Sequence, residues 1–116
     1  MEISLQLFGG RGVSSGKNYR NYYLNKMKNP KAKNVIDQLY RPGAKCGDGG
    51  TADALKQESR TGQKVEGKRH YQKAKERLKN ITNVLNKENL TKMERDILEL
   101  MYKKLMEAIE EWEQRN

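Results

Sequence analysis

Residues 68–116 read KRHYQKAKERLKNITNVLNKENLTKMERDILELMYKKLMEAIEEWEQRN. Apolar side chains recur there at spacings of three and four residues, first from Tyr71 to Leu85 and again from Met93 to Trp112. Such spacing is typical of amphipathic helices, which turn one apolar face toward a core. The stretch therefore predicts two consecutive helices.

The junction between these two helices carries its own signal. Thr91 and Glu94 stand three residues apart, the spacing of a capping box, in which each side chain accepts a hydrogen bond from a backbone N–H of the first turn. Residues 86–90 form only a short break, and short connections join antiparallel neighbours. We therefore expect residues 68–116 to form an antiparallel helical hairpin.

The apolar stripe of the second helix is wider than one partner helix needs. Its members are Met93, Ile97, Leu100, Met101, Leu105, Ala108, Ile109 and Trp112. We expect part of this stripe to cover the N-terminal strand or short helices, or a second copy of the protein. Dimerisation is thus one of the possible arrangements.

Two shorter helices are predicted upstream. Residues 17–28 place tyrosines and apolar side chains at helical spacing. Asn29 followed by Pro30 is typical of a helix start, and Pro42 with Gly43 ends the apolar face that follows. This second short helix has the clearer boundaries.

Some β structure is also expected. Residues 2–8 alternate apolar and polar side chains, the period of a half-buried strand. Residues 54–58 and 64–66 flank Gly62, which can adopt the positive φ of a tight turn, so a small β-hairpin is predicted within 51–67. The expected fold class is mainly α (α+β), with a C-terminal hairpin packed against short N-terminal helices.

The chain is expected to form one domain with three segments. These are a basic, glycine-rich region over 1–50, the possible β-hairpin over 51–67 and the helical hairpin over 68–116. With 116 residues, only a modest core can be built. A single cysteine and the lack of an apolar run near about 18 residues predict a cytoplasmic protein that neither crosses a membrane nor needs a disulfide.

Charge is distributed unevenly along the chain. The net charge is +9, and residues 1–90 hold nineteen basic and eight acidic side chains against five and seven in 91–116. A basic body attracts phosphate, acidic protein surfaces or anionic lipid. The sequence therefore favours a binding protein with an anionic partner.

Two basic clusters are candidate contacts. The stretch 17–28 interleaves tyrosines with cations, as in proteins that bind single strands through phosphates and base faces, although its apolar residues suit a structural or protein-facing role equally well. The cluster 64–79 lies along a predicted helix. It is either a solvated helix face or a surface that tracks a phosphate backbone. The candidate residues are Arg11, Lys17, Tyr19, Arg20, Tyr22, Lys26, Lys28, Lys68, Arg69, Lys73 and Arg77.

Catalytic chemistry has little support in the sequence. Residues 10–17 invite comparison with a nucleotide-binding P-loop, but Arg11 stands where the first glycine is required and Asn18 where Ser or Thr would follow the lysine. A mobile linker or a glycine-rich loop that touches phosphate fits better. Cys46 and His70, each the sole residue of its kind, indicate neither a nucleophile and base nor a metal site. No enzyme activity, metal or cofactor is expected.

Short motifs resemble a group of small phage proteins. LQLFGGRG at 5–12 with SSG at 14–16 is similar to the start of many proteins of tailed phages and prophages of Gram-positive bacteria, and some phage capsid proteins also begin with a similar LQLF. A second block, GGTA at 49–52, TG at 61–62, Gly67, HYQKA at 70–74 and Arg77, is also similar. The resemblance covers roughly half of the chain.

This resemblance implies a phage origin and no catalytic residues. It leads us to expect a non-enzymatic inhibitor of a host nucleic-acid-processing complex, most concretely an anti-CRISPR protein that acts in the host cytoplasm on an RNA-guided nuclease, its guide RNA or its DNA. The alternatives are a structural or DNA-condensing component of the phage head, and a regulator that binds DNA or RNA alone.

Overall fold

The computed structural model describes residues 18–65 and 67–115, and the strand predicted over 2–8 lies outside them. The fold is mainly α, as predicted. The helices are α1 (Arg20–Leu24), α2 (Pro30–Leu39), α3 (Thr51–Thr61), α4 (Tyr71–Lys87) and α5 (Lys92–Arg115). Two isolated bridges, Tyr40 with Gly50 and Val65 with Lys68, supply the β pairing of the described residues.

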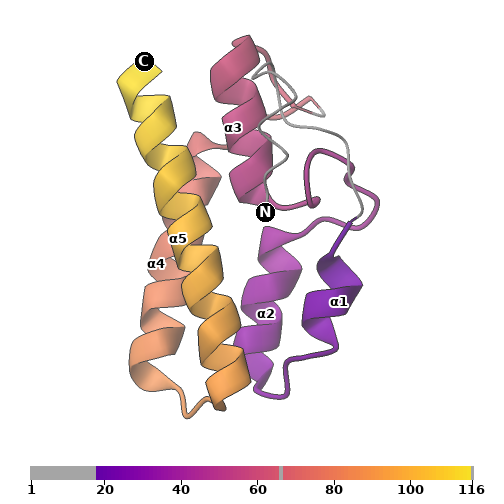
Figure 1. Ribbon diagram of the computed structural model, residues 1–116, viewed down its shortest axis with the longest axis vertical. Coiled ribbons are helices and arrows are strands. Elements are labelled where there is room, and N and C mark those ends of the chain that lie inside the picture. Colours follow the sequence, from indigo (N-terminus) through magenta and orange to yellow (C-terminus); the bar gives the residue numbers. More distant parts are fainter. Residues whose placement is uncertain (1–17, 66, 116) are drawn as a thin grey trace.

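The predicted helical hairpin is confirmed and forms the frame of the molecule. α5 has 24 residues and so is about 36 Å long, close to the longest dimension of 39 Å. α5 packs against α4 and α3, while α2 packs against α4 and α1 against α2. In Figure 1, α3 and α2 lie one above the other along the same side of the hairpin. None of the described helices is long and apolar enough to span a lipid bilayer.

The capping box at the start of α5 is confirmed, and it does more than begin that helix. The N–H of Thr91 donates to Glu94 Oε1 at 2.9 Å, and the N–H of Glu94 donates to Thr91 Oγ1 at 3.1 Å. Glu94 Oε2 also accepts from the N–H groups of Lys28 (2.6 Å) and Asn29 (2.8 Å). These backbone donors lower the pKa of Glu94 to about 2. One buried carboxylate thus joins the starts of α2 and α5.

Asn29 caps α2 as the sequence predicted. Its side-chain oxygen accepts hydrogen bonds from two N–H groups of the first turn, and Pro30 occupies the first helical position. α2 then buries Ala32, Val35, Ile36 and Leu39 in the core.

The predicted apolar stripe of α5 is wrong at two positions. Met93 and Leu100 are 53% and 45% exposed, whereas Leu98 is fully buried. The buried face of α5 also carries Met101 and Leu105, and it meets both α3 and α4. The stripe does cover more than its hairpin partner, but among the described residues the element that it meets is α3, from the segment predicted as a β-hairpin, and not the short N-terminal helices that were expected.

The β-hairpin predicted within 51–67 is wrong, because most of that segment is α3. Gly62 does adopt a positive φ of 74°, but it ends the helix, and its N–H donates to the carbonyl of Glu58 at 2.8 Å. The Glu58 side chain is fully buried and accepts from the N–H of His70 (2.8 Å) and from Arg69 (3.3 Å). A buried carboxylate at a core position obscures the apolar period that would have predicted a helix.

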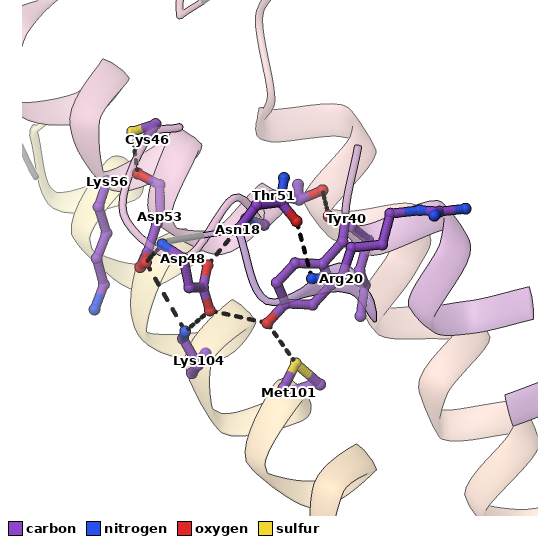
Figure 2. A network of polar contacts seen from close by, with 12 residues as sticks. Asn18, Arg20, Tyr40, Cys46, Asp48, Thr51, Asp53, Lys56, Met101 and Lys104 are labelled. Carbon is purple, nitrogen blue, oxygen red and sulfur yellow. Dashed lines mark hydrogen bonds and ion pairs between the residues drawn. The ribbon is translucent and has the colours of Figure 1, made fainter. Parts of the chain in front are cut away.

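A buried polar network fixes the loop 41–50 between α2 and α3 (Figure 2). Tyr40 Oη donates to Asp48 Oδ2 at 2.9 Å, and the N–H of Asp48 donates to Asp53 Oδ2 at 2.9 Å. Lys104 of α5 forms an ion pair with Asp48, and its Nζ lies 3.9 Å from Asp53. Burial raises the pKa of Asp53 and opposes ionisation of Asp48, but Lys104 and its hydrogen bonds hold the pKa of Asp48 below its usual value.

Glycine is required at Gly49, within the loop 41–50. This residue has a φ of +87°, and a Cβ placed on it would lie 2.7 Å from Asn18 Nδ2 and 3.1 Å from the carbonyl oxygen of Ala44. Asn18 uses the space that the missing side chain leaves, since its Nδ2 donates to the carbonyls of Arg41 (2.8 Å) and Ala44 (2.9 Å). The loop is therefore an ordered part of the fold.

Candidate functional site

A small hollow of about 70 Å³ lies where α2 ends and where α3 and α4 begin, beside the loop 41–50. Arg41, Lys73, Arg77 and His70 stand on its wall, and the described residues that line it include neither Asp nor Glu. We call this site the cationic hollow. Its volume is several times the roughly 10–15 Å³ that a cavity needs to hold one water molecule.

Separate elements bring these cations together. Arg41 follows α2, and its backbone is held by the hydrogen bond from Asn18 described above. Lys73 and Arg77 belong to α4 and stand one turn apart, so both reach the same side of the helix. The hollow thus depends on how α2 and α4 pack, which no local motif specifies.

The cations repel one another. Burial lowers the pKa of Lys73, and the charges of Lys68, Arg41 and Arg77 lower it further, while Glu76 offsets only part of this effect. Among the described residues, Arg77 Nε is buried without a hydrogen-bond partner, although Arg77 Nη1 lies 3.9 Å from Glu76 Oε1. An anion in the hollow would relieve the repulsion between these cations.

Two helix starts add to the positive potential. Gly50 and Thr51 begin α3, and His70 immediately precedes α4, so both helix starts contribute to the wall. The first turn of an α-helix carries unpaired N–H groups and a partial positive charge that favour anions. Asp53 in the first turn of α3 bonds the N–H of Asp48 and does not line the hollow.

Cys46 and His70 also line the cationic hollow. His70 is only 8% exposed, and its Nδ1 lies 3.4 Å from the buried carboxylate of Glu58, whereas Cys46 Sγ donates to the carbonyl of Asp53 at 3.6 Å. Within the part of the chain that the structure describes, no three His, Cys, Asp or Glu residues gather as a metal site would require.

The first predicted cluster is only partly an exposed binding surface. Tyr19 and Tyr22 of the α1 region are 39% and 53% exposed, with ring centroids 5.8 Å apart, and Lys26 Nζ lies 4.8 Å from the centre of the Tyr22 ring. Arg20, by contrast, forms an ion pair with Asp37 of α2. Arg11 and Lys17 lie outside the described residues.

Lys28 and the residues of the second cluster also include both exposed cations and cations that are paired. Lys28 is exposed, and its N–H, as noted, bonds Glu94. Lys68 adds charge beside Lys73, but Arg69 pairs with Glu58 and is partly neutralised. Lys68, Lys73 and Arg77 are therefore the predicted residues that the structure brings together.

Sequence reasoning missed Arg41 as a member of this group. Its only signal was the high density of basic residues along the N-terminal half, since it lies more than thirty positions from Lys73. Comparison with protein-family models, with curated proteins and with solved structures finds no match to this chain.

Proposed function

We propose that this protein is a non-enzymatic binding protein that holds the phosphate backbone of nucleic acid at the cationic hollow. One observation carries the proposal: Arg41, Lys73 and Arg77 surround a hollow whose described lining has no carboxylate. Burial lowers the pKa of Lys73, and the charges of Lys68, Arg41 and Arg77 lower it further. Cations that face one another are suited to an anionic ligand.

The phage resemblance suggests the setting in which such binding acts. We propose that the protein inhibits a host nucleic-acid-processing complex, most concretely an RNA-guided nuclease, by competing for its DNA or by holding its guide RNA. The exposed tyrosines Tyr19 and Tyr22, with Lys26 beside them, would extend the contact surface.

Binding is tested by fluorescence anisotropy with a labelled oligonucleotide over a series of salt concentrations. The double variant Lys73→Gln with Arg77→Gln removes two charges from the hollow. Lys87→Gln with Lys103→Gln removes two exposed charges elsewhere and is the matched control. On single strands we expect the hollow variant to bind at least tenfold more weakly and its salt slope to fall by about 1.4. Equal losses in both variants would contradict a localised site.

Inhibition is tested separately with a purified RNA-guided nuclease and its target DNA. We expect excess protein to prevent cleavage and the hollow variant to be much weaker. Unchanged cleavage at large molar excess of protein would exclude that nuclease as the target, while leaving phosphate binding to the anisotropy measurement.

Exposed apolar side chains on α5 favour a second candidate, a component of the phage head. Met93 and Leu100 are 53% and 45% exposed and stand seven residues apart, so both lie on one face of α5 that is available for assembly. Mass spectrometry of purified virions separates the candidates, because a head component is present in the particle and an inhibitor of a host enzyme is not required there.

A further inference from the structure

A second, larger hollow of about 610 Å³ lies between the end of α3, the start of α4 and the end of α5. Tyr71, Trp112 and Arg69 stand on its wall, and Lys73 belongs to this wall and to that of the cationic hollow. We call this site the aromatic hollow. The two hollows therefore share Lys73.

Two aromatic rings stand on the wall of the aromatic hollow. The rings of Tyr71 and Trp112 are stacked, with centroids 5.6 Å apart and planes 23° apart. Tyr71 is held in place, since its hydroxyl donates to Glu113 at 2.6 Å and Lys75 Nζ lies 5.1 Å from its ring centre. A fixed aromatic pair beside cations is the combination that proteins use to stack nucleobases.

Polar groups on the same wall suit a ligand with a polar edge. Ser59 is 8% exposed, and its Oγ finds no hydrogen-bond partner among the described residues. Buried hydroxyl groups ordinarily have such a partner. Among the described residues of the wall, the one carboxylate is Glu58. It is engaged by Arg69 and by the N–H of His70, so it repels an incoming anion less than a free carboxylate would.

We infer that the aromatic hollow receives an unpaired nucleobase, so that the ligand is single-stranded nucleic acid with a backbone phosphate in the cationic hollow. This inference rests on the proposed phosphate binding and adds the class of strand. A base within a duplex is stacked between its neighbours and does not present its face to a protein ring. Lys73, shared by both hollows, neutralises the phosphate next to the stacked base.

The test uses Trp112, the only tryptophan in the chain, as an internal reporter. The full-length protein is titrated with a short oligothymidylate, with an abasic strand of the same length and with a duplex of the same length. Binding is followed by anisotropy of the labelled strands and by tryptophan emission. We expect the oligothymidylate to shift or quench the emission and to bind about tenfold more tightly than the abasic strand.

The outcomes separate the two claims. Equal affinity for all three ligands with unchanged tryptophan emission would overturn base stacking and leave phosphate binding intact. Absence of binding to every ligand would overturn both. A preference for the duplex would also contradict the inference.

A variant provides a second line of evidence. Trp112→Leu should bring the affinity for oligothymidylate down to that for the abasic strand, whereas Tyr102→Leu, which removes an exposed aromatic ring elsewhere on α5, should not. Trp112 also packs against the core. If Trp112→Leu does not fold, the comparison of ligands on the unaltered protein still decides the question.

Discussion

The loop network around Lys104 and the cationic hollow both contain a partly buried lysine, but the charges around the two lysines have opposite signs. At Lys104 the cation meets Asp48 directly and Asp53 at 3.9 Å, and all three are largely buried. In the hollow, Lys73 meets the charges of Lys68, Arg41 and Arg77. The contrast indicates that the first group stabilises the fold, whereas the second group is the anion-binding site of the proposed function.

The largest loss of stability is expected at Glu94. Glu94→Ala leaves the N–H groups of Lys28, Asn29 and Thr91 without their acceptor, and we expect the free energy of unfolding to fall by about 4 kcal/mol. Urea denaturation measures this value. Glu99→Ala, at an exposed position of the same helix, is the control and should cost less than 0.5 kcal/mol.

The same carboxylate predicts sensitivity to acid. Its pKa is about 2 in the folded protein and near 4.5 when unfolded. Its contribution is therefore complete above about pH 4.5 and is lost as the pH falls toward 2, by up to about 3 kcal/mol. Stability measured across this range should decline less steeply in Glu94→Ala. Parallel declines in the two proteins would contradict the assignment.

A somewhat smaller loss is expected at the paired cation of α5. Lys104→Met leaves Asp48 and Asp53 facing each other without a cation, and we expect a cost of about 3 kcal/mol in urea denaturation. Lys103→Met changes a neighbouring exposed lysine and should be nearly neutral. If both variants were equally stable, the loop network would not be a stabilising feature.

The loop itself can be tested by a matched pair of glycines. Gly49→Ala and Gly43→Ala both place a side chain at positive φ, +87° and +80°, but only the first meets neighbouring atoms within 4 Å. We expect about 2 kcal/mol of destabilisation for Gly49→Ala and about 1 kcal/mol for Gly43→Ala. Thermal unfolding measures both losses of stability. Equal losses would show that the position of Asn18 does not require a glycine at residue 49.

The smallest effect is expected in the hollow and has the opposite sign. Lys73→Gln removes a repelled charge, so it should raise the free energy of unfolding by about 0.5 kcal/mol at low salt, and the gain should fade as salt screens the charges. Denaturation at two ionic strengths measures this gain. A clear loss of stability would place Lys73 with the structural cations.

Local signals explain why the sequence predicted some elements well. Helix caps act within one helical turn, so their roles can be predicted from the sequence. This holds for Thr91 and Glu94 at α5 and for Asn29 and Pro30 at α2. α3 was missed because Glu58 is buried at one of its core positions and Gly62 has the same positive φ in a helix cap as in a tight turn.

The candidate site was only half predictable for a related reason. Lys73 and Arg77 are neighbours on one helix, so the periodicity already placed them together. Arg41 reaches them because α2 packs on α4, and Arg20 is lost to an ion pair with Asp37 on another helix. Such partnerships are decided by tertiary packing, which a single sequence does not display.

The most direct test of the central claim is the thermal stability of the protein with added inorganic phosphate at constant ionic strength. A ligand that binds the folded state raises the melting temperature. We predict that phosphate raises the melting temperature of the unaltered protein and of the Lys87→Gln, Lys103→Gln control, but not that of the Lys73→Gln, Arg77→Gln variant. Equal shifts in all three proteins would contradict an anion site at the cationic hollow.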